Sequence, residues 1–393
     1  MKIQSKISGL RTASALTALI LALPLPFLKG LTGLHLWLSP FIMLNSAITL
    51  RSFAFMNTAA LLILILITIH KRWFCANLCP AGWLLDNSAG KNKSTKFTYK
   101  RIPEIGKWIA VISLSAAIAG IPLFIFLDPV TVLNGFITVF AIKFKVLAII
   151  TLSGFLLLFV INLFLPGLWC RKICPLGGLQ MVVHEIKSLF KKYTSGIKET
   201  DIAYNPGRRY TLMSLSGLLA GVLIRKSYNT VINDIILPPA SVGRNLFSSL
   251  CCRCGSCIKA CPTSIIGFNT GPSDLLSFMT PEVKFGPGYC LEECNLCSRV
   301  CPTGAIALFD PDAKGQLFMG SAVITLPDCR LLNNSECNKC LESCKYGAIM
   351  FYHGSGYLNM FPVVDEKKCV GCGACMVVCP ESCIIIRPVN SKA

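Results

Sequence analysis

The stretch C-C-R-C-G-S-C-I-K-A-C-P, residues 251–262, decides the fold of the C-terminal part of the chain. Its cysteines at positions 251, 254, 257 and 261, with a proline directly after, match the spacing C-x2-C-x2-C-x3-C-P of bacterial iron–sulfur proteins. The same spacing returns in full at residues 369–380. Iron–sulfur clusters need thiolate ligands, and closely spaced cysteines on a tight loop provide them with little loss of chain entropy. We therefore expect [4Fe–4S] clusters in this part of the chain.

Two further cysteine runs are variants of this pattern. The second run, 290–302, has one extra residue between its first two cysteines, and the third, starting at Cys329, has a longer first gap and Lys345 in place of the proline. Taken alone, the third run also fits a structural zinc site of four cysteines, but it stands in register with three iron–sulfur runs. Together the runs supply the sixteen expected ligands of four [4Fe–4S] clusters: Cys251, Cys254, Cys257, Cys261, Cys290, Cys294, Cys297, Cys301, Cys329, Cys337, Cys340, Cys344, Cys369, Cys372, Cys375 and Cys379.

The four runs form an internal repeat. A short apolar strand is expected after each fourth cysteine, at 265–266, 305–308, 348–351 and 384–386. Residues 251–393 are therefore predicted to form an α+β domain of two bacterial-type two-cluster ferredoxin units, in which the fourth cysteine of a run ligates the partner cluster. Whether run one pairs with run two or with run four stays open. Cys252 and Cys383 are left over and are expected to be small buried hydrophobic side chains.

The first half of the chain is strongly apolar. Hydrophobic residues make up 53% of the protein and charged residues only 15%, against about 25% charged residues in soluble proteins. A bilayer crossing takes roughly 20 apolar residues, and the stretches near 13–35, 53–70, 108–127 and 146–166 are long enough. We predict that residues 1–190 form an α-helical transmembrane bundle of four spans in contact with lipid. The stretch 31–50 contains polar residues and a proline and is expected at the membrane interface.

The net charge of +19 is explained by membrane topology and not by nucleic-acid binding, because the basic residues cluster beside the apolar spans. The loops after the second and fourth spans are strongly basic, and contain Lys71, Arg72, Lys91, Lys93, Lys96, Lys100, Arg101 and Lys107, and Arg171, Lys172, Lys187, Lys191, Lys192, Lys198, Arg208 and Arg209. The loops on the other side carry only Lys29, Arg51, Lys143 and Lys145. The N-terminus and both basic loops are therefore expected to be cytoplasmic.

Residues 191–250 are predicted to hold a basic segment, a fifth apolar helix at 210–224 and a linker. The helix directly follows Arg208-Arg209, a pair typical of a twin-arginine export signal. An ordinary fifth span is one alternative, and a helix lying along the inner surface is another. Export or a fifth span would place the cluster domain on the periplasmic face of the cytoplasmic membrane, which is the location that we expect. Export of a folded, metallated domain would protect its thiols from oxidation to disulfides.

Two short motifs, C-x3-C-P, end the second and fourth predicted spans on their cytoplasmic side. Their cysteines are Cys75, Cys79, Cys170 and Cys174, and a glycine follows each proline closely. Thiols at positions i and i+4 of a helix share one face, so two neighbouring helices could place the four thiols around one point. We expect a further metal or cluster centre there, or a redox-active dithiol pair. The alternative is that these cysteines only pack at the helix ends. The four histidines offer no facing pair for a haem within the spans.

These motifs resemble known families. Residues 1–190, with four spans and two C-x3-C-P motifs, resemble the NapH-type membrane quinol dehydrogenases and the membrane part of NosR. Residues 205–393, with Arg208-Arg209 and four cysteine runs, resemble the MauM/NapG family of ferredoxin-type proteins, so the chain looks like a fusion of the two. NapH-type proteins commonly carry their own C-terminal pair of cluster motifs, and here none lies between Cys174 and Cys251.

The resemblance implies that electrons pass from menaquinol or ubiquinol through the clusters to a periplasmic acceptor, such as a cytochrome c or a reductase. The chain would then be the electron-transfer subunit of a quinol dehydrogenase within a complex. Asp128, just past the third span, is a candidate proton acceptor for quinol, against the alternative of an ordinary helix-end residue. Two other functions stay open: an electron donor in the maturation or regulation of a partner enzyme, and an electron-transfer subunit of a larger respiratory complex with a multihaem cytochrome.

Overall fold

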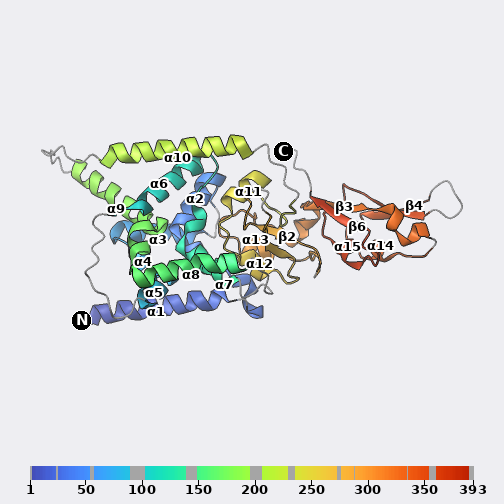
Figure 1. Cartoon of the computed structure of the whole chain (residues 1–393), viewed down its shortest axis with the longest axis horizontal. Helices are drawn as coiled ribbons and strands as arrows, with labels where there is room; N and C mark the ends of the chain where they lie inside the picture. Colours follow the sequence, from blue (N-terminus) through green and yellow to red (C-terminus); the bar gives the residue numbers. More distant parts are fainter. Residues whose placement is uncertain are drawn as a thin grey trace. The chain divides into compact units, whose positions relative to one another are not determined.

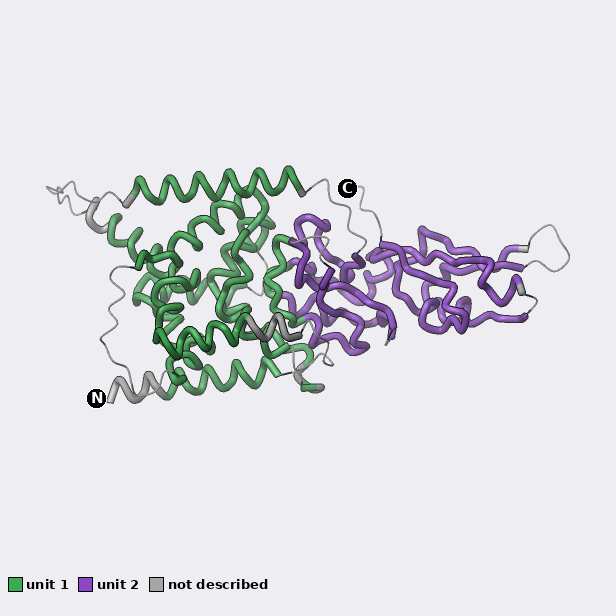
Figure 2. The backbone as a smooth tube through the Cα atoms, viewed as in Figure 1, with its two compact units in different colours: residues 1–231, 248–256, 302–304 green, residues 232–247, 257–301, 305–393 purple. Residues whose placement is uncertain are grey.

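The structure is a computed structural model that describes residues 2–23, 25–53, 57–88, 102–138, 148–194, 206–228, 235–271, 276–286, 288–333, 335–353 and 360–388 (Figure 1). The chain divides into two compact units (Figure 2). Unit 1 holds residues 1–231, 248–256 and 302–304, and unit 2 holds residues 232–247, 257–301 and 305–393. The first unit is helical, and the second contains all the described β-strands.

Unit 1 contains the longer helices of the described chain. They are α1 (Lys2–Ala22), α2 (Pro40–Leu50), α3 (Thr58–Ile69), α6 (Ile105–Ile118), α7 (Pro129–Thr138), α8 (Ala148–Phe164), α9 (Pro175–Thr194) and α10 (Pro206–Tyr228). Shorter turns connect them: η1 (Pro26–Leu31), η2 (Leu34–Leu38), α4 (Trp73–Asn77), α5 (Pro80–Ser88), η5 (Ile125–Leu127) and the π-helical turn η7 (Trp169–Ile173). Many of these helices begin at a proline, which suits the first helical position because the N–H there has no partner within the helix.

Helix α6 lies in the middle of unit 1 and packs against α2, α9 and α10. Glycines allow two of these contacts to be very close. A Cβ atom on Gly178 of α9 would lie 2.5 Å from the backbone nitrogen of Lys107, and one on Gly217 of α10 would lie 2.6 Å from the carbonyl oxygen of Ile112. Because α10 approaches α6 so closely, it is an integral helix of unit 1.

Each predicted span contains a helix, but the helices are shorter than the apolar stretches. Helix α1 ends at Ala22, within the first stretch, and α3, α6 and α8 occupy the other three. Among the described residues, no single helix combines the length and the apolar composition of a membrane span, although the bent pair Lys29–Leu38 and Pro40–Leu50 does so jointly, at 93°. Within the stretch 31–50, Leu36 and Phe41 are buried in the core of unit 1, and its position at a membrane interface stays a prediction.

The predicted orientation rests largely on residues that the structure does not describe. Lys91, Lys93, Lys96, Lys100, Arg101, Lys143, Lys145 and Lys198 lie outside the described residues. Arg208 and Arg209 are exposed in the first turn of α10. Membrane crossing, its direction and the export signal therefore stay predictions.

Unit 2 contains three two-stranded antiparallel sheets. In these, β1 (Ile266–Phe268) pairs with β2 (Pro281–Val283), β3 (Gly320–Ile324) with β6 (Ile384–Pro388), and β4 (Ile349–His353) with β5 (Met360–Val364). Strands thus follow the fourth cysteines of runs one, three and four. After run two the backbone forms only an isolated bridge, between Ser241 and Ile306, so the strand expected at 305–308 was wrong.

Short helices carry the third cysteine of every run. These helices are α12 (Ser256–Ala260), α13 (Leu296–Arg299), α14 (Lys339–Glu342) and α15 (Ala374–Val378). Between runs two and three lie the 3-10 helix η8 (Pro311–Gln316) and the 3-10 turn η9 (Leu326–Asp328), and a further 3-10 turn, η10 (Arg330–Asn333), belongs to the long first gap of run three. The repeat seen in the sequence is therefore repeated in the local structure.

Candidate iron–sulfur sites

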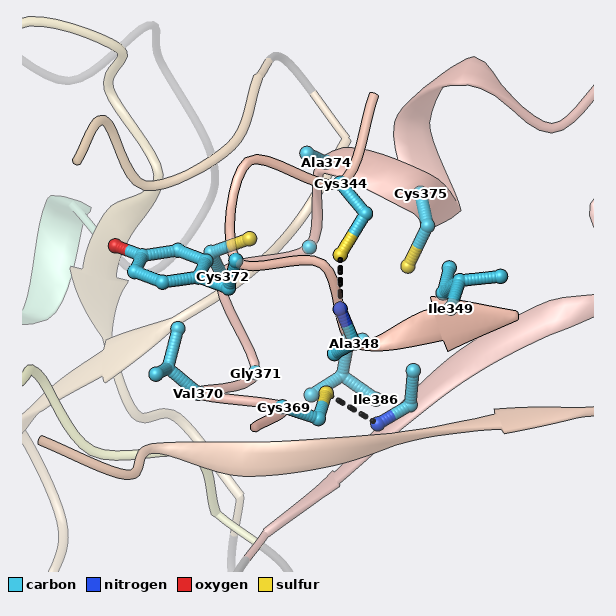
Figure 3. A pocket seen from close by; sticks show the side chains of 13 residues that line it. Cys344, Ala348, Ile349, Cys369, Val370, Gly371, Cys372, Ala374, Cys375 and Ile386 are labelled. Atoms are coloured by element: carbon cyan, nitrogen blue, oxygen red, sulfur yellow. Dashed lines mark hydrogen bonds between the residues drawn. The ribbon is translucent and has the colours of Figure 1, made fainter. Parts of the chain in front are cut away.

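Figure 3 shows a cavity in unit 2 whose wall contains four cysteines. We call it the run-four cavity, because Cys369, Cys372 and Cys375 come from run four, whereas Cys344 is the fourth cysteine of run three. Two of the sulfur atoms accept backbone hydrogen bonds, Cys344 from the Ala348 N–H at 3.2 Å and Cys369 from the Ala322 N–H at 3.4 Å. Four sulfurs around one space match the ligand number of a [4Fe–4S] cluster.

Two further cavities of unit 2 also combine three cysteines of one run with the fourth cysteine of another run. The run-three cavity is lined by Cys329, Cys337 and Cys340 and, from run four, by Cys379. The run-two cavity is lined by its own three cysteines and by the fourth cysteine of run one: Cys290, Cys294, Cys297 and Cys261. The structure therefore pairs run one with run two and run three with run four, which the sequence had left open.

The two leftover cysteines lie in different surroundings. Cys252 is buried in the apolar core of unit 1, as expected for a small hydrophobic side chain. Cys383 is also buried, but it is a fifth cysteine in the wall of the run-three cavity, and its Sγ lies 3.4 Å from that of Cys379. It occupies the position four residues after the fourth cysteine, where run three has Ala348.

Lys314 of η8 is a feature that the sequence reasoning missed. Its side chain is only 3% exposed, and its Nζ donates hydrogen bonds to the carbonyl oxygens of Leu291 and of Cys294, the latter at 2.8 Å. Burial raises the pKa of the Cys290 thiol, and the Lys314 ammonium opposes that rise. A buried ammonium is costly unless a negative charge compensates it. A cluster on four thiolates is anionic, so the run-two cavity fits that group.

Tyr346 was also missed, and it lines the run-four cavity. Among the described residues its buried hydroxyl has no hydrogen-bond partner. Burial raises the pKa of this phenol, and Cys372 and Cys290 raise it further, so the hydroxyl stays protonated and is a donor for an acceptor placed in the cavity. Cys290 and Cys372 are themselves joined, because the Cys290 N–H donates to the Cys372 carbonyl at 2.9 Å.

The first two cysteines of run one belong to unit 1, where helix α7 holds their loop. The Cys254 carbonyl accepts hydrogen bonds from Asn134 Nδ2 at 2.7 Å and from Thr138 Oγ1 at 3.3 Å, and both side chains are fully buried. Gly255 has a φ of +72°, and a Cβ atom there would lie 2.5 Å from Thr138 Oγ1. The close approach of α7 therefore requires glycine at this position.

In the two C-x3-C-P motifs the structure differs from the expected geometry. Cys75 lies in α4 and Cys170 in η7, but each helix ends before the second cysteine of its motif. Cys79 and Cys174 stand directly before the prolines that begin α5 and α9, and their sulfurs accept the Gly82 and Gly177 N–H groups at 3.3 and 3.4 Å. The expectation that both cysteines of a motif share one helix face was wrong, because each proline starts a new helix.

The four thiols of these motifs nevertheless lie near one another. Burial raises the pKa of all four, that of Cys170 to about 12, and neighbouring cysteines of the set raise those of Cys79, Cys170 and Cys174 further. Buried Gln180 of α9 donates from Nε2 to Cys75 Sγ at 2.9 Å. Within the described ranges, no three His, Cys, Asp or Glu side chains are placed to hold a single metal ion.

Asp128 stands at the start of α7 and is fully buried. Its Oδ1 accepts the Val130 N–H at 2.8 Å, and its Oδ2 accepts the Ser39 hydroxyl at 2.7 Å. A carboxylate that accepts the N–H two residues ahead is a helix N-cap. The structure therefore gives Asp128 a capping role, which was the alternative to a proton acceptor.

Two family models match the chain. One, described as a 4Fe-4S dicluster domain, matches residues 250–305 and 335–384, which contain most of the four cysteine runs. The other, described as a 4Fe-4S binding domain, matches residues 53–96 and 147–193, around the two C-x3-C-P motifs. The expected binding of [4Fe–4S] clusters is confirmed at this level.

Curated relatives match the C-terminal part of the chain. The ferredoxin-type protein NapF of Escherichia coli strain K12 is 31% identical over 153 residues, which are 38% of this chain and 82% of NapF. The methylamine utilization ferredoxin-type protein MauM of Methylobacillus flagellatus is 27% identical over 48% of this chain and 86% of MauM. The ferredoxin-type protein NapG of Escherichia coli strain K12 is 31% identical over 36% of this chain and 64% of NapG. No solved structure matches the chain.

Proposed function

The chain belongs to the family of ferredoxin-type proteins, and from this membership we propose that it carries four [4Fe–4S] clusters, takes electrons from quinol in the cytoplasmic membrane and passes them to a periplasmic respiratory partner. Its electron-transfer role follows from the family and from the matched cluster domains. The clusters supply the one-electron redox chemistry, while the protein supplies binding and electrostatics.

The exchange of fourth cysteines is the observation that carries this proposal. Three cavities each combine three cysteines of one run with the fourth of its partner, as in two-cluster ferredoxins. The remaining ligands expected from the sequence are Cys251, Cys254, Cys257 and Cys301. The buried Lys314 charge and the buried Tyr346 hydroxyl add chemistry that suits an anionic, sulfur-rich group.

The membrane part of the proposal is supported by the outer surface of unit 1. Large apolar side chains are exposed along several helices, including Leu62 and Ile65 on α3, Leu157 on α8, and Leu219 and Leu223 on α10. Exposed apolar surface of this extent is typical of a surface that contacts lipid or another protein. We propose that unit 1 is the NapH-like membrane part of a fusion and that the clusters face the periplasm.

Unit 1 is also where quinol would be oxidised. Asn134 and Thr138 bind the loop of the first cysteine run to α7, so an electron released within unit 1 has a bonded route toward the first cluster. The cysteines of the C-x3-C-P motifs form a further candidate centre, for which the second family model favours a [4Fe–4S] cluster over a dithiol pair.

A count of iron and sulfide on the purified full-length protein, with EPR, tests the cluster assignment. Four clusters contain about 16 iron atoms, and a fifth centre would raise the count to about 20. The exchange of fourth cysteines between runs also predicts which EPR signal each single cysteine variant loses. Cys344→Ser and Cys372→Ser, in different runs, should remove the same EPR signal, whereas Cys340→Ser, in the same run as Cys344, should remove a different one. Loss of one signal by both run-three variants would contradict the exchange.

The quinol step is tested separately, on full-length protein in lipid vesicles under anaerobic conditions. We expect a quinol analogue to reduce the clusters. Clusters that stay oxidised under excess quinol would refute quinol oxidation while leaving the cluster assignment intact. Cys75→Ser and Cys170→Ser then show whether the candidate fifth centre is needed for this reduction, and Cys252→Ser is a matched control for removal of a buried thiol in unit 1.

A further inference from the structure

Lys314 is a buried cation that is hydrogen-bonded to residues of the run-two cavity wall, Leu291 and Cys294. It lies in η8, and its ammonium group has three N–H donors. Two of them are used by the carbonyl oxygens of Leu291 and Cys294, which belong to the loop between the first two cysteines of the second run. The ammonium is therefore held by the loop that lines the run-two cavity.

Its charge, in contrast, is not balanced by a carboxylate. Neutral carbonyl groups solvate an ammonium but carry no net charge, and none of the ion pairs between described residues includes Lys314. Burying an unpaired charge is expensive, and proteins retain such groups where a partner charge is present. The run-two cavity offers that negative charge in its cysteine ligands, since the ammonium is bonded to the carbonyl oxygens of Leu291 and Cys294, both of which line this cavity.

We propose that Lys314 is the built-in counter-charge of the cluster in the run-two cavity and makes it the most easily reduced of the three clusters whose cavities lie in unit 2. The inference rests on the proposed cluster assignment. An electron that arrives on the cluster adds negative charge beside a fixed positive charge, and the attraction is strong because little water screens it.

The other two cavities lack an equivalent group. The wall of the run-four cavity contains no lysine or arginine among its lining residues. The run-three cavity has Arg330 and Lys339, but both are exposed, and Arg330 is already paired with Glu381. Exposed cations are screened by water and contribute little. The difference in burial therefore predicts a difference in reduction potential between the cavities.

The position of Lys314 gives this potential a role in electron transfer between the two cysteine-run pairs. Cys290, which Lys314 contacts, donates its backbone N–H to the carbonyl of Cys372 in the neighbouring run-four cavity. The cluster favoured by Lys314 is thus the one that adjoins the second pair of runs. Electrons would therefore reside on the run-two cluster, between the two pairs of runs, before they pass on.

The test is a mediated redox titration of the full-length protein, followed by EPR. Lys314→Met keeps the length of the side chain and removes the charge. We expect it to disfavour reduction of one cluster about tenfold or more, a fall of about 59 mV for a one-electron couple. The affected signal should be the one that Cys294→Ser removes. Lys314→Arg should recover most of the shift, and Lys339→Met, at an exposed cation of another cavity, should leave all potentials unchanged.

Each outcome decides the proposal. Unchanged potentials in Lys314→Met with full iron content would overturn it, and so would an equal shift in Lys339→Met. If Lys314→Met loses the run-two cluster, restoration of that cluster by Lys314→Arg supports the counter-charge, and failure of Lys314→Arg to restore it overturns it. Mediators replace quinol in this experiment, so failure of the quinol step would not affect the result. Failure of the cluster assignment would already appear as an iron deficit in the unmodified protein.

Discussion

Replacing Gly373 by alanine should damage the run-four cavity for two separable reasons. Gly373 caps the N-terminus of α15, between Cys372 and Cys375, with a φ of +81°. A side chain at positive φ costs about 1–2 kcal/mol. The new Cβ atom would also overlap the ring of Phe285, lying 2.5 Å from its Cε1 atom, and overpacking of this kind costs about 1–3 kcal/mol.

The sum, about 2–5 kcal/mol, is a large part of the stability of a typical domain, about 5–15 kcal/mol. Gly347 provides a matched control. It also has a positive φ, +58°, but no atom lies within 4 Å of the position that its Cβ would occupy. Gly347→Ala should therefore show the backbone cost alone, and the difference between the two variants measures the clash with Phe285.

The assay is the rate at which full-length protein loses its visible cluster absorbance in a fixed concentration of guanidinium under anaerobic conditions. If the clash contributes at least 1.4 kcal/mol to the barrier, Gly373→Ala should lose cluster absorbance about tenfold faster than Gly347→Ala. Iron analysis before the assay separates failed assembly from faster loss. Equal rates and equal iron contents in the two variants would refute the reasoning, since they would mean that Phe285 moves aside at no cost.

Two further predictions concern single polar contacts. Tyr346→Phe removes only the buried hydroxyl at the run-four cavity, so reduction of one cluster should become less favourable by about threefold to tenfold, because a hydrogen bond contributes about 1 kcal/mol; the exposed Tyr352→Phe is the control, and EPR titration measures both. Thr138→Val removes a donor to the Cys254 carbonyl and should slow electron transfer from quinol to the first cluster in stopped-flow measurements. Thr131→Val, also buried on α7, removes instead a hydroxyl that donates to the Asp128 carbonyl and should not slow this transfer; an equal effect of both variants would contradict a specific link to the cluster loop.

The cysteine spacing was enough to predict the sites but not their pairing. Runs one and four match the iron–sulfur pattern in full, a short helix carries the third cysteine of each run, and a strand follows runs one, three and four. The exchange of Cys344 and Cys379 between cavities depends on which loops meet in space. The sequence alone does not show which loops lie together, because both possible pairings of the runs use the same sixteen cysteines.

Lys314 and Tyr346 could not be recognised for a related reason. A lysine in a short turn after a proline ordinarily lies in solvent, and the burial of Lys314 results from its bonds to the second run. Tyr346 did leave a signal. It stands two residues after the fourth cysteine, where runs one and two carry Thr263 and Thr303, so an aromatic residue at this position of the repeat is an exception that could have been noticed.

The C-x3-C-P motifs show where the helix-face argument failed. A proline cannot continue a helix beyond its first turn, so Pro80 and Pro175 should have been read as the starts of new helices. The prediction that the four thiols lie around one point was based on the likeness of the two motifs. It agrees with the effect that these thiols have on one another's pKa values. The role of Gln180 needed the structure, because only the fold brings α9 beside Cys75.

The positions of Cys79 and Cys174 have an electrical consequence. Each sulfur occupies the N-terminal end of a helix, α5 or α9, and accepts one of its free N–H groups. The aligned peptide dipoles give such an end about half an elementary positive charge. Each helix end therefore places partial positive charge beside one of these sulfurs, and the backbone itself helps to stabilise negative charge on Cys79 and on Cys174.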